Sequence, residues 1–288
     1  MSTRLLGGVL RAGPLLPLRR GVREIRDYFH YRPRPGFKPR EIVRGPFSSV
    51  AVARSLRERG VCILEGALAP EKLRAAREAF EDLFVDADGR VLGRTDVPET
   101  YSRVIDCAQH PLLAELVLDE LILAAVEAYY ARPIYVATTQ ANRLDPVEPF
   151  DGDSYQWHHD TKGKYVKTMW LLTDVRRDGQ RMSYVAGSHT LRHRGTTYED
   201  SRFADDHAKS LGEVVECVGP AGSVVVFDTN GIHRGNRNRG PRRDVLFGVY
   251  SAGRYLLGCR FEPERVGHLT EWQREVLERS QTPTREYR

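Results

Sequence analysis

Lysine is scarce in this chain of 288 residues, although basic residues are not. Arginine supplies most of the 44 basic side chains and is interleaved with 39 acidic ones, for a formal net charge of +5. A nucleic-acid surface shows a clustered basic stripe with stacking aromatic residues. Scattered arginines therefore favour no nucleic-acid partner. The lysines are Lys38, Lys72, Lys162, Lys164, Lys167 and Lys209.

Long apolar runs are missing as well. No stretch approaches the ~20 apolar residues that a membrane-spanning helix needs. The four cysteines include no Cys-x-x-Cys pair, which argues against a zinc ribbon or a dithiol motif. Free thiols are typical of a reducing compartment. These absences predict a chain without a membrane span and with a cytoplasmic location.

The first 23 residues are unusual in charge. They contain five arginines and no acid before Glu24, as in the Arg-rich, acid-poor transit segments of organelles. Serine and threonine, which such segments favour, are nearly absent here. Arg11, Pro14 and Pro17 interrupt the apolar run that a secretory signal would need. A mitochondrial location therefore remains the alternative to the cytoplasm.

Residues 1–46 read as an irregular basic extension, because Pro33 and Pro35 disfavour helix around them. Residues 47–288 read as a single domain that begins with a helical part over 47–131. Ser48 or Ser49 is positioned to cap a helix that Gly60 ends. A short buried strand is expected next. The expected elements of this part are helices at 48–59, 69–85 and 111–131 and a strand at 61–64.

The texture changes after residue 132, where short β-rich segments alternate with Gly, Pro or Asp-Gly turns. Such spacing is typical of an antiparallel barrel or jelly roll. We therefore predict an α+β, mainly β fold, with a double-stranded β-helix (cupin-like jelly roll) at 132–255 buttressed by the N-terminal helices. A C-terminal helix is expected at about 269–279. The expected strands are 134–142, 166–175, 182–186, 213–218, 223–227 and 243–251.

The sequence Gln156-Trp157-His158-His159-Asp160 carries the clearest chemical signal. Side chains alternate along a strand, so His158 and Asp160 share one face while His159 points to the other. His233, at the end of a predicted strand and an Asn-Gly turn, supplies a second imidazole. Two histidines and one carboxylate on one face of a metal are typical of non-haem Fe(II) oxygenases. His159 is assigned to packing or support.

The pair Arg242-Arg243 opens the strand after His233. An arginine there can project into the barrel and hold a carboxylate through two parallel hydrogen bonds. The two side chains have opposite parity, so only one can point inward. The alternative is that both are solvated.

Several motifs in order resemble the phytanoyl-CoA dioxygenase family. They are Trp157 to Asp160, Lys167 to Asp174, Ala186 to His189, His233, and Pro241-Arg242, and the resemblance covers roughly residues 45–255. It implies a jelly-roll oxygenase that uses Fe(II), 2-oxoglutarate and O₂, with ascorbate as a stimulant. It further implies that His158, Asp160 and His233 bind iron, that Arg242 anchors 2-oxoglutarate, and that Trp170 and Asn142 contact the cosubstrate.

The chain departs from the family pattern after the distal histidine. Arg234 and Gly235 stand where the family often has a hydroxyl residue, and the interval from His233 to Arg242 is short. A catalytically silent jelly-roll binding module, or a cupin-like metal enzyme without 2-oxoglutarate, are therefore the alternatives. Asp160 is retained, whereas halogenating relatives lose this carboxylate. Hydroxylation or a related C–H oxidation of a small molecule, with release of succinate and CO₂, is the expected reaction.

The substrate is expected to be a small metabolite. A positive rim would favour an anionic one, and a solvated loop is the alternative. The residues of this rim would be Lys162, Lys164, Lys167, Arg192, Arg194 and Arg202.

Overall fold

The computed structural model describes residues 33–85, 101–105, 107–148, 155–160, 165–191, 201–253, 266 and 269–281. The chain divides into two units, 1–32 and 33–288, and residues 33–46 of the expected extension belong to the second. The Arg-rich first 23 residues lie outside the described residues. So do four residues of the expected positive rim, which are Lys162, Lys164, Arg192 and Arg194.

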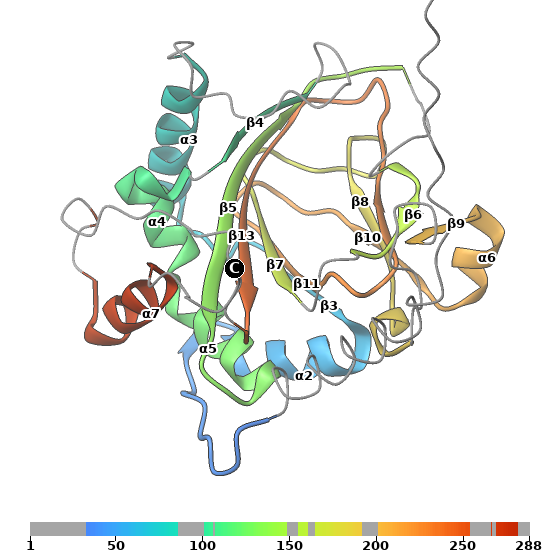
Figure 1. Cartoon of the computed structure of the whole chain (residues 1–288). Coiled ribbons are helices and arrows are strands. Elements are labelled where there is room, and N and C mark those ends of the chain that lie inside the picture. Colours follow the sequence, from blue (N-terminus) through green and yellow to red (C-terminus); the bar gives the residue numbers. More distant parts are fainter. Residues whose placement is uncertain are drawn as a thin grey trace, which may run out of the picture. The chain divides into compact units, whose positions relative to one another are not determined.

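Two antiparallel sheets form the centre of the second unit and face each other (Figure 1). This architecture confirms the predicted jelly roll. The large sheet has six strands in the order β3 (Val61–Leu64), β11 (Val224–Asp228), β7 (Val166–Leu171), β13 (Arg243–Ser251), β5 (Tyr135–Leu144) and β4 (Tyr101–Ile105). The small sheet has five strands in the order β10 (Val214–Cys217), β8 (Met182–Val185), β12 (His233–Gly235), β6 (Trp157–His158) and β9 (Arg202–Phe203).

The residue pattern of the sequence accounts for the long strands. Every residue of β11 is buried, as expected for a central strand covered on both faces. β13 pairs with β5 on one side and β7 on the other, and its bounds match the predicted strand at 243–251. Because side chains alternate, one face of these strands points between the sheets and the other toward the helices.

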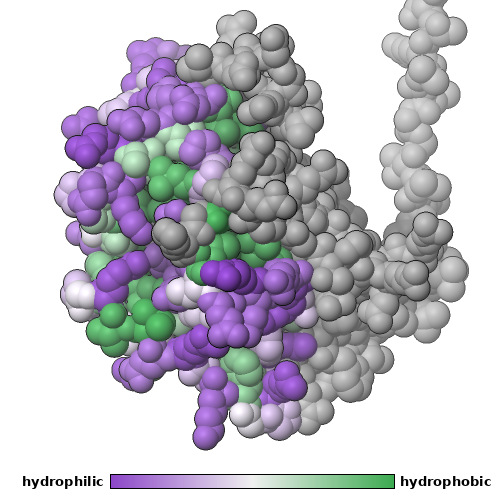
Figure 2. Space-filling model, turned by 90° about the vertical axis from the view of Figure 1, so that its left-hand side faces the viewer, coloured by the Kyte–Doolittle hydropathy of each residue, from purple (hydrophilic) through white to green (hydrophobic). Residues whose placement is uncertain are grey.

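Helices cover the outer face of the large sheet (Figure 1). Arg143 on β5 faces outward and pairs with Asp244 through two hydrogen bonds of 3.0 Å, and with Glu81 on a helix. The helices are α2 (Ser49–Arg59), α3 (Pro70–Val85), α4 (Pro111–Val117), α5 (Glu120–Tyr130) and α7 (Glu271–Gln281). Figure 2 shows that the face over this side of the molecule is largely hydrophilic, with smaller hydrophobic areas between.

Helix α2 ends where the sequence predicts. Gly60 adopts a left-handed backbone conformation (φ 77°), and its N–H donates to the Leu56 carbonyl. A Cβ at this position would lie 2.3 Å from the Tyr184 hydroxyl oxygen. Glycine is therefore required both by the conformation and by the close approach of β8.

The prediction of a single helix at 111–131 is wrong, because the structure has two helices there. Asp119 breaks it by accepting a hydrogen bond from the Ile122 N–H at 3.2 Å, which makes it the N-cap of α5. Arg44, in the ribbon formed by β1 (Val43–Arg44) and β2 (Phe47–Ser48), pairs with the same carboxylate. This contact comes from a distant segment, so helical periodicity does not reveal it.

Several short elements were not predicted. Strands of two or three residues show no periodicity, so β9 and β12 carry no sequence signal. The strand expected to run through His158 and Asp160 is shorter than predicted, because β6 ends at His158. The remaining elements outside the prediction are β1, β2, β4, α6 (Asp205–Ser210) and the 3₁₀ turns η1 (Cys107–Gln109) and η3 (Ser188–Thr190). Among the helices of the described part of the chain, none is both long and apolar enough to cross a membrane.

Candidate metal site and its pocket

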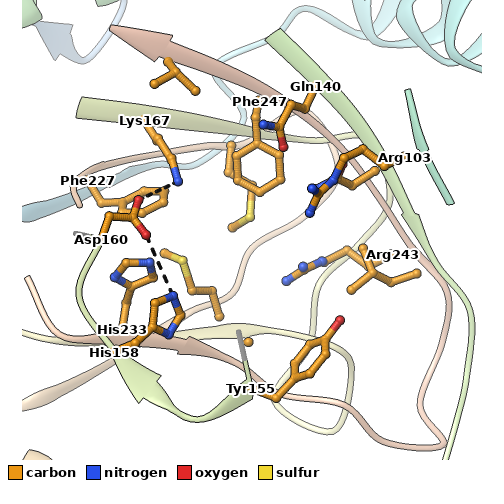
Figure 3. A pocket seen from close by; sticks show the side chains of 16 residues that line it. Arg103, Gln140, Tyr155, His158, Asp160, Lys167, Phe227, His233, Arg243 and Phe247 are labelled. Carbon is orange, nitrogen blue, oxygen red and sulfur yellow. Dashed lines mark hydrogen bonds and ion pairs between the residues drawn. The ribbon is translucent and has the colours of Figure 1, made fainter. Parts of the chain in front are cut away.

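A cavity of about 150 Å³ lies between the two sheets. The small sheet and the residues beside it contribute two histidines and an aspartate, grouped at one side (Figure 3). The large sheet contributes most of the remaining lining. Its polar members are Arg103, Gln140, Asn142, Lys167 and Arg243, and its apolar members are Leu144, Met169, Phe227, Phe247 and Val249.

His158, Asp160 and His233 converge as the sequence spacing suggests. One potential ligand atom from each residue lies within 4.8 Å of the others. The ring centroids of the two histidines are 4.4 Å apart, and His158 Nε2 lies 3.9 Å from Asp160 Oδ1. His158 and His233 are direct partners across β6 and β12. Asp160 lies beyond the end of β6, and its N–H donates to the Thr229 carbonyl at 2.9 Å.

Backbone carbonyl groups of nearby residues hold both imidazole rings. His158 Nδ1 lies 2.8 Å from the Gln156 carbonyl oxygen, and His233 Nδ1 lies 2.8 Å from that of Gly231. A carbonyl can only accept a hydrogen bond, so Nδ1 carries the proton in each ring. The Nε2 lone pairs are then free to bind a metal, which is how metal-binding histidines are oriented.

The protonation states suit metal binding as well. Burial, and then the nearby His233, lower the pKa of His158 to about 3. Burial likewise lowers the pKa of His233. Burial alone would raise the pKa of Asp160, but Lys167, with the two histidines, outweighs it and lowers that pKa. Two neutral imidazoles and one carboxylate therefore meet here at neutral pH.

The Asn-Gly sequence forms the turn before His233. Asp228 Oδ1 accepts from the Asn230 N–H at 2.8 Å and from its side-chain amide at 2.9 Å. The Tyr129 hydroxyl on α5 donates to the other oxygen of Asp228 at 2.5 Å. The carboxylate thus fixes the turn that aims His233 at the cavity, and burial raises the pKa of Tyr129, which keeps its hydroxyl a donor.

This donor set fits Fe(II). Imidazole and carboxylate ligands are those that Fe(II) accepts, and two histidines with one carboxylate on one face leave positions open for other ligands. The Nε2 lone pairs and the ionised carboxylate are directed into a cavity with further polar groups across from them. His159 is buried but does not line the cavity, in agreement with its opposite parity.

The arginine pair differs from the sequence-based assignment. Arg242 is half exposed, and its Nε donates to Asp145 at 2.7 Å outside the cavity. Arg243 is 7% exposed and lines the cavity with Phe247 and Val249. Strand β13 begins at Arg243, so alternation turns this side chain inward and Arg242 away. The prediction that Arg242 points into the site is wrong by one residue.

Of the two other residues predicted to contact the cosubstrate, one lines the cavity and the other does not. Asn142 on β5 lines the cavity. Trp170 does not, because on β7 it is Lys167 and Met169 that point inward. Trp170 is fully buried, and its cross-strand partners are Leu246 on β13 and Val224 on β11. The placement of Trp170 next to a cosubstrate is therefore corrected.

Sequence reasoning missed several residues that line the cavity. Gln140 shares the parity of Asn142, and Phe247 shares that of Arg243, so alternation would have found both once the inward face was known. Arg103 lies on β4, for which no strand was predicted, opposite Asn142. Tyr155 precedes the two-residue strand β6 and gives no signal of its own.

Comparison with known proteins identifies the family of the chain. The family model described as "Phytanoyl-CoA dioxygenase (PhyH)" matches residues 56–245. An ectoine dioxygenase of Stutzerimonas stutzeri is 25% identical over 245 residues, which are 73% of this chain and 80% of the relative. The ectoine dioxygenase of Bordetella bronchiseptica is 28% identical over 170 residues, 49% of this chain, and this match spans only 54% of the relative.

Solved structures share the fold. The epimerase SnoN from nogalamycin biosynthesis, crystallised with Fe³⁺ and α-ketoglutarate, has a TM-score of 0.58 and 18% identity, covering 70% of this chain and 83% of that one. EctD from S. alaskensis, with 2-oxoglutarate and 5-hydroxyectoine, has a TM-score of 0.57 and 20% identity, covering 76% and 82%. Since the family model spans most of the sequence, the chain belongs to the phytanoyl-CoA dioxygenase family of Fe(II)- and 2-oxoglutarate-dependent oxygenases.

Proposed function

We propose that this protein hydroxylates, or otherwise oxidises a C–H bond of, a small anionic molecule. The observation that carries the proposal is the pairing of two features across one cavity. His158, Asp160 and His233 group at one side, and Arg243 enters from the large sheet (Figure 3). An iron site alone would suit many chemistries, whereas an inward arginine across from it suits a dicarboxylate cosubstrate.

The residues have distinct roles in this proposal. His158, Asp160 and His233 hold Fe(II), which together with 2-oxoglutarate supplies the O₂ activation that oxidises a C–H bond and yields succinate and CO₂. Arg243 pairs with the far carboxylate of 2-oxoglutarate, because a guanidinium binds a carboxylate through two parallel hydrogen bonds. It takes the role that the resemblance implied for Arg242.

Apolar residues that line the same cavity as the ligands and the arginine help to orient the reactants. Met169, Phe227, Phe247 and Val249 come from adjacent strands and face the cavity together. Such a wall excludes water, which strengthens the electrostatic interactions inside the site. The protein thereby holds cosubstrate and substrate in place while the cofactor carries out the oxidation.

The charges of the lining favour an anionic substrate. Among the described residues that line the cavity, Asp160 is the single carboxylate, whereas Arg103, Lys167 and Arg243 are basic. Arg103 projects into the cavity from β4, beside Arg243 (Figure 3). With Arg243 assigned to the cosubstrate, the guanidinium of Arg103 is placed to meet a carboxylate or phosphate on the substrate.

The test is succinate formation from 2-oxoglutarate by the full chain with added Fe(II), with and without candidate molecules. Ectoine, which the names of two relatives suggest, is the first probe. Other probes are small carboxylates, each paired with the amide of the same skeleton. The carboxylate members should raise succinate formation above the level without a substrate, and R103Q should abolish the difference between carboxylate and amide.

Other outcomes separate the alternatives. No succinate under any condition, with Fe(II) bound, would favour a catalytically silent binding module. Oxidation of a probe without consumption of 2-oxoglutarate would favour a cupin-like enzyme without the keto acid. An equal response to amides and carboxylates would reject the anionic substrate and leave the oxygenase assignment in place.

A further inference from the structure

Lys167 contacts the carboxylate of the candidate metal site directly. It lies on β7 in the large sheet, with Phe227 and Val249 as its cross-strand partners. Its side chain lines the cavity, and Nζ donates to Asp160 Oδ2 at 2.7 Å (Figure 3). Both side chains are 25% exposed. The ion pair therefore joins the large sheet to the ligands carried by the small one.

The two oxygens of Asp160 have different surroundings. Oδ2 is occupied by the Lys167 ammonium, whereas Oδ1 lies toward His158 Nε2 at 3.9 Å. An aspartate can bind a metal through one oxygen or through both. Using both would place the metal ion on an oxygen that the Lys167 ammonium already holds, which the repulsion between the two cations opposes. The contact thus distinguishes the two modes of ligation.

We infer that Lys167 is a positioning residue that restricts Asp160 to ligation through one oxygen and so keeps a coordination position open for 2-oxoglutarate. The inference rests on the proposed iron site. A set of two histidines and one carboxylate works because the remaining positions stay free for cosubstrate and O₂. If Asp160 bound through both oxygens, it would occupy one of the positions that the cosubstrate needs.

This role has an effect that simple support of the fold would not have. An ammonium beside the site repels a divalent cation, so its removal should not weaken metal binding. Its removal should weaken 2-oxoglutarate binding, because the freed carboxylate oxygen then competes for the metal. Loss of a residue that only stabilises the fold would weaken both.

The experiment compares wild-type full chain with K167M, K167R and K209M. Lys209 is an exposed lysine on α6 that pairs with Asp205, so K209M is a matched loss of one ion pair away from the cavity. Mn(II) binding is followed through the signal of the free ion in electron paramagnetic resonance. Binding of 2-oxoglutarate to the Mn(II)-loaded protein is then measured by calorimetry without oxygen.

K167M should bind Mn(II) at least as tightly as wild type, while its Kd for 2-oxoglutarate rises about tenfold or more, the size of effect that residues supporting metal ligands have. K167R, which keeps a charged donor, should restore cosubstrate binding to near the wild-type value. K209M should match wild type in both measurements.

Three results would overturn the inference. They are an unchanged Kd for 2-oxoglutarate in K167M, a parallel weakening of Mn(II) and 2-oxoglutarate, and a failure of K167R to restore binding. A wild-type protein that binds no Mn(II) would instead reject the metal site itself. If K167M does not fold, as judged by circular dichroism, K167A replaces it, since alanine likewise offers no donor to Asp160 Oδ2. Its Kd for 2-oxoglutarate should also rise.

Discussion

Gly231 packs so closely against Tyr184 that a Cβ on the glycine would lie 1.8 Å from the phenol oxygen and 2.1 Å from the ring carbon that bears it. The Tyr184 hydroxyl donates to the Asp228 carbonyl at 2.9 Å, and the Gly231 carbonyl accepts from His233 Nδ1. The Tyr184 ring therefore packs against the turn, and the turn in turn holds the imidazole of His233 through a hydrogen bond.

The first prediction follows from this contact. G231A should force the turn away from Tyr184 and misdirect His233, with a loss of stability of ~1–3 kcal/mol, as for overpacked sites. Mn(II) affinity and the thermal midpoint should both fall. In the G231A/Y184A double variant the ring is gone, so metal affinity should recover in part. If G231A binds Mn(II) like wild type, the close packing does not orient His233.

The second prediction concerns the anionic ligand. D160A removes the carboxylate from the metal site, so Fe(II) binding should weaken strongly and succinate formation should cease. Circular dichroism should remain that of wild type, since Asp160 lies beyond the end of β6. Full activity of D160A in excess iron would contradict the assignment of Asp160 as a ligand.

The third prediction concerns the cosubstrate anchor. R243K keeps the charge but loses the planar fork that pairs with a carboxylate. The KM for 2-oxoglutarate should rise by the equivalent of ~1.5–3 kcal/mol, as for hydrogen bonds to charged groups. R242K is the matched control, because Arg242 pairs with Asp145 outside the cavity. An effect in R242K with none in R243K would reverse the assignment.

The fourth prediction concerns pH. The pKa of His158 is lowered from 6.5 to about 3 by burial and by His233, so the unfolded chain binds this proton more readily than the folded one. The metal-free protein should therefore lose stability as the pH falls from about 6.5 toward 4, by up to ~1.4 kcal/mol per pH unit for this one proton.

A variant isolates this contribution. H158Q removes the titrating group, so its thermal midpoint should fall less steeply than that of wild type over the same pH range. Both proteins carry Asp160, whose pKa is lowered from 3.8 in the folded chain, so its own loss of stability near pH 4 is common to the two curves. Parallel curves for the two proteins would show that His158 is not held neutral by the fold.

The sequence predicted the features that have a period or a strong local signal. The strand at 243–251 and the end of α2 at Gly60 match the structure, since alternation and a C-terminal glycine define them locally. The convergence of His158 with His233 was inferred from spacing and from the family resemblance. The break at Asp119 and the inward turn of Arg243 were not found, because each depends on a contact with a distant segment or on where a strand begins.

The other features that the sequence did not predict concern residues that meet across the cavity. Lys167 was read as part of a positive rim, because its contact with Asp160 exists only once the two sheets face each other. Arg103 lies on an edge strand whose sequence shows no clear alternation. Residues that meet by virtue of the sheet-to-sheet arrangement have no counterpart in local sequence patterns, and for these the folded arrangement was needed.

The site is divided between two sheets, and this division separates the residues that can vary from the residues that cannot. The histidines and their backbone anchors belong to the small sheet and its turns, whereas Arg103, Gln140 and Asn142 belong to the outer strands of the large sheet. We therefore expect substitutions on β4 or β5 to exchange one accepted molecule for another without disturbing the proposed iron ligands. We expect Lys167 to be an exception, since it reaches from the large sheet to Asp160, so a substitution there would alter specificity and the metal site together.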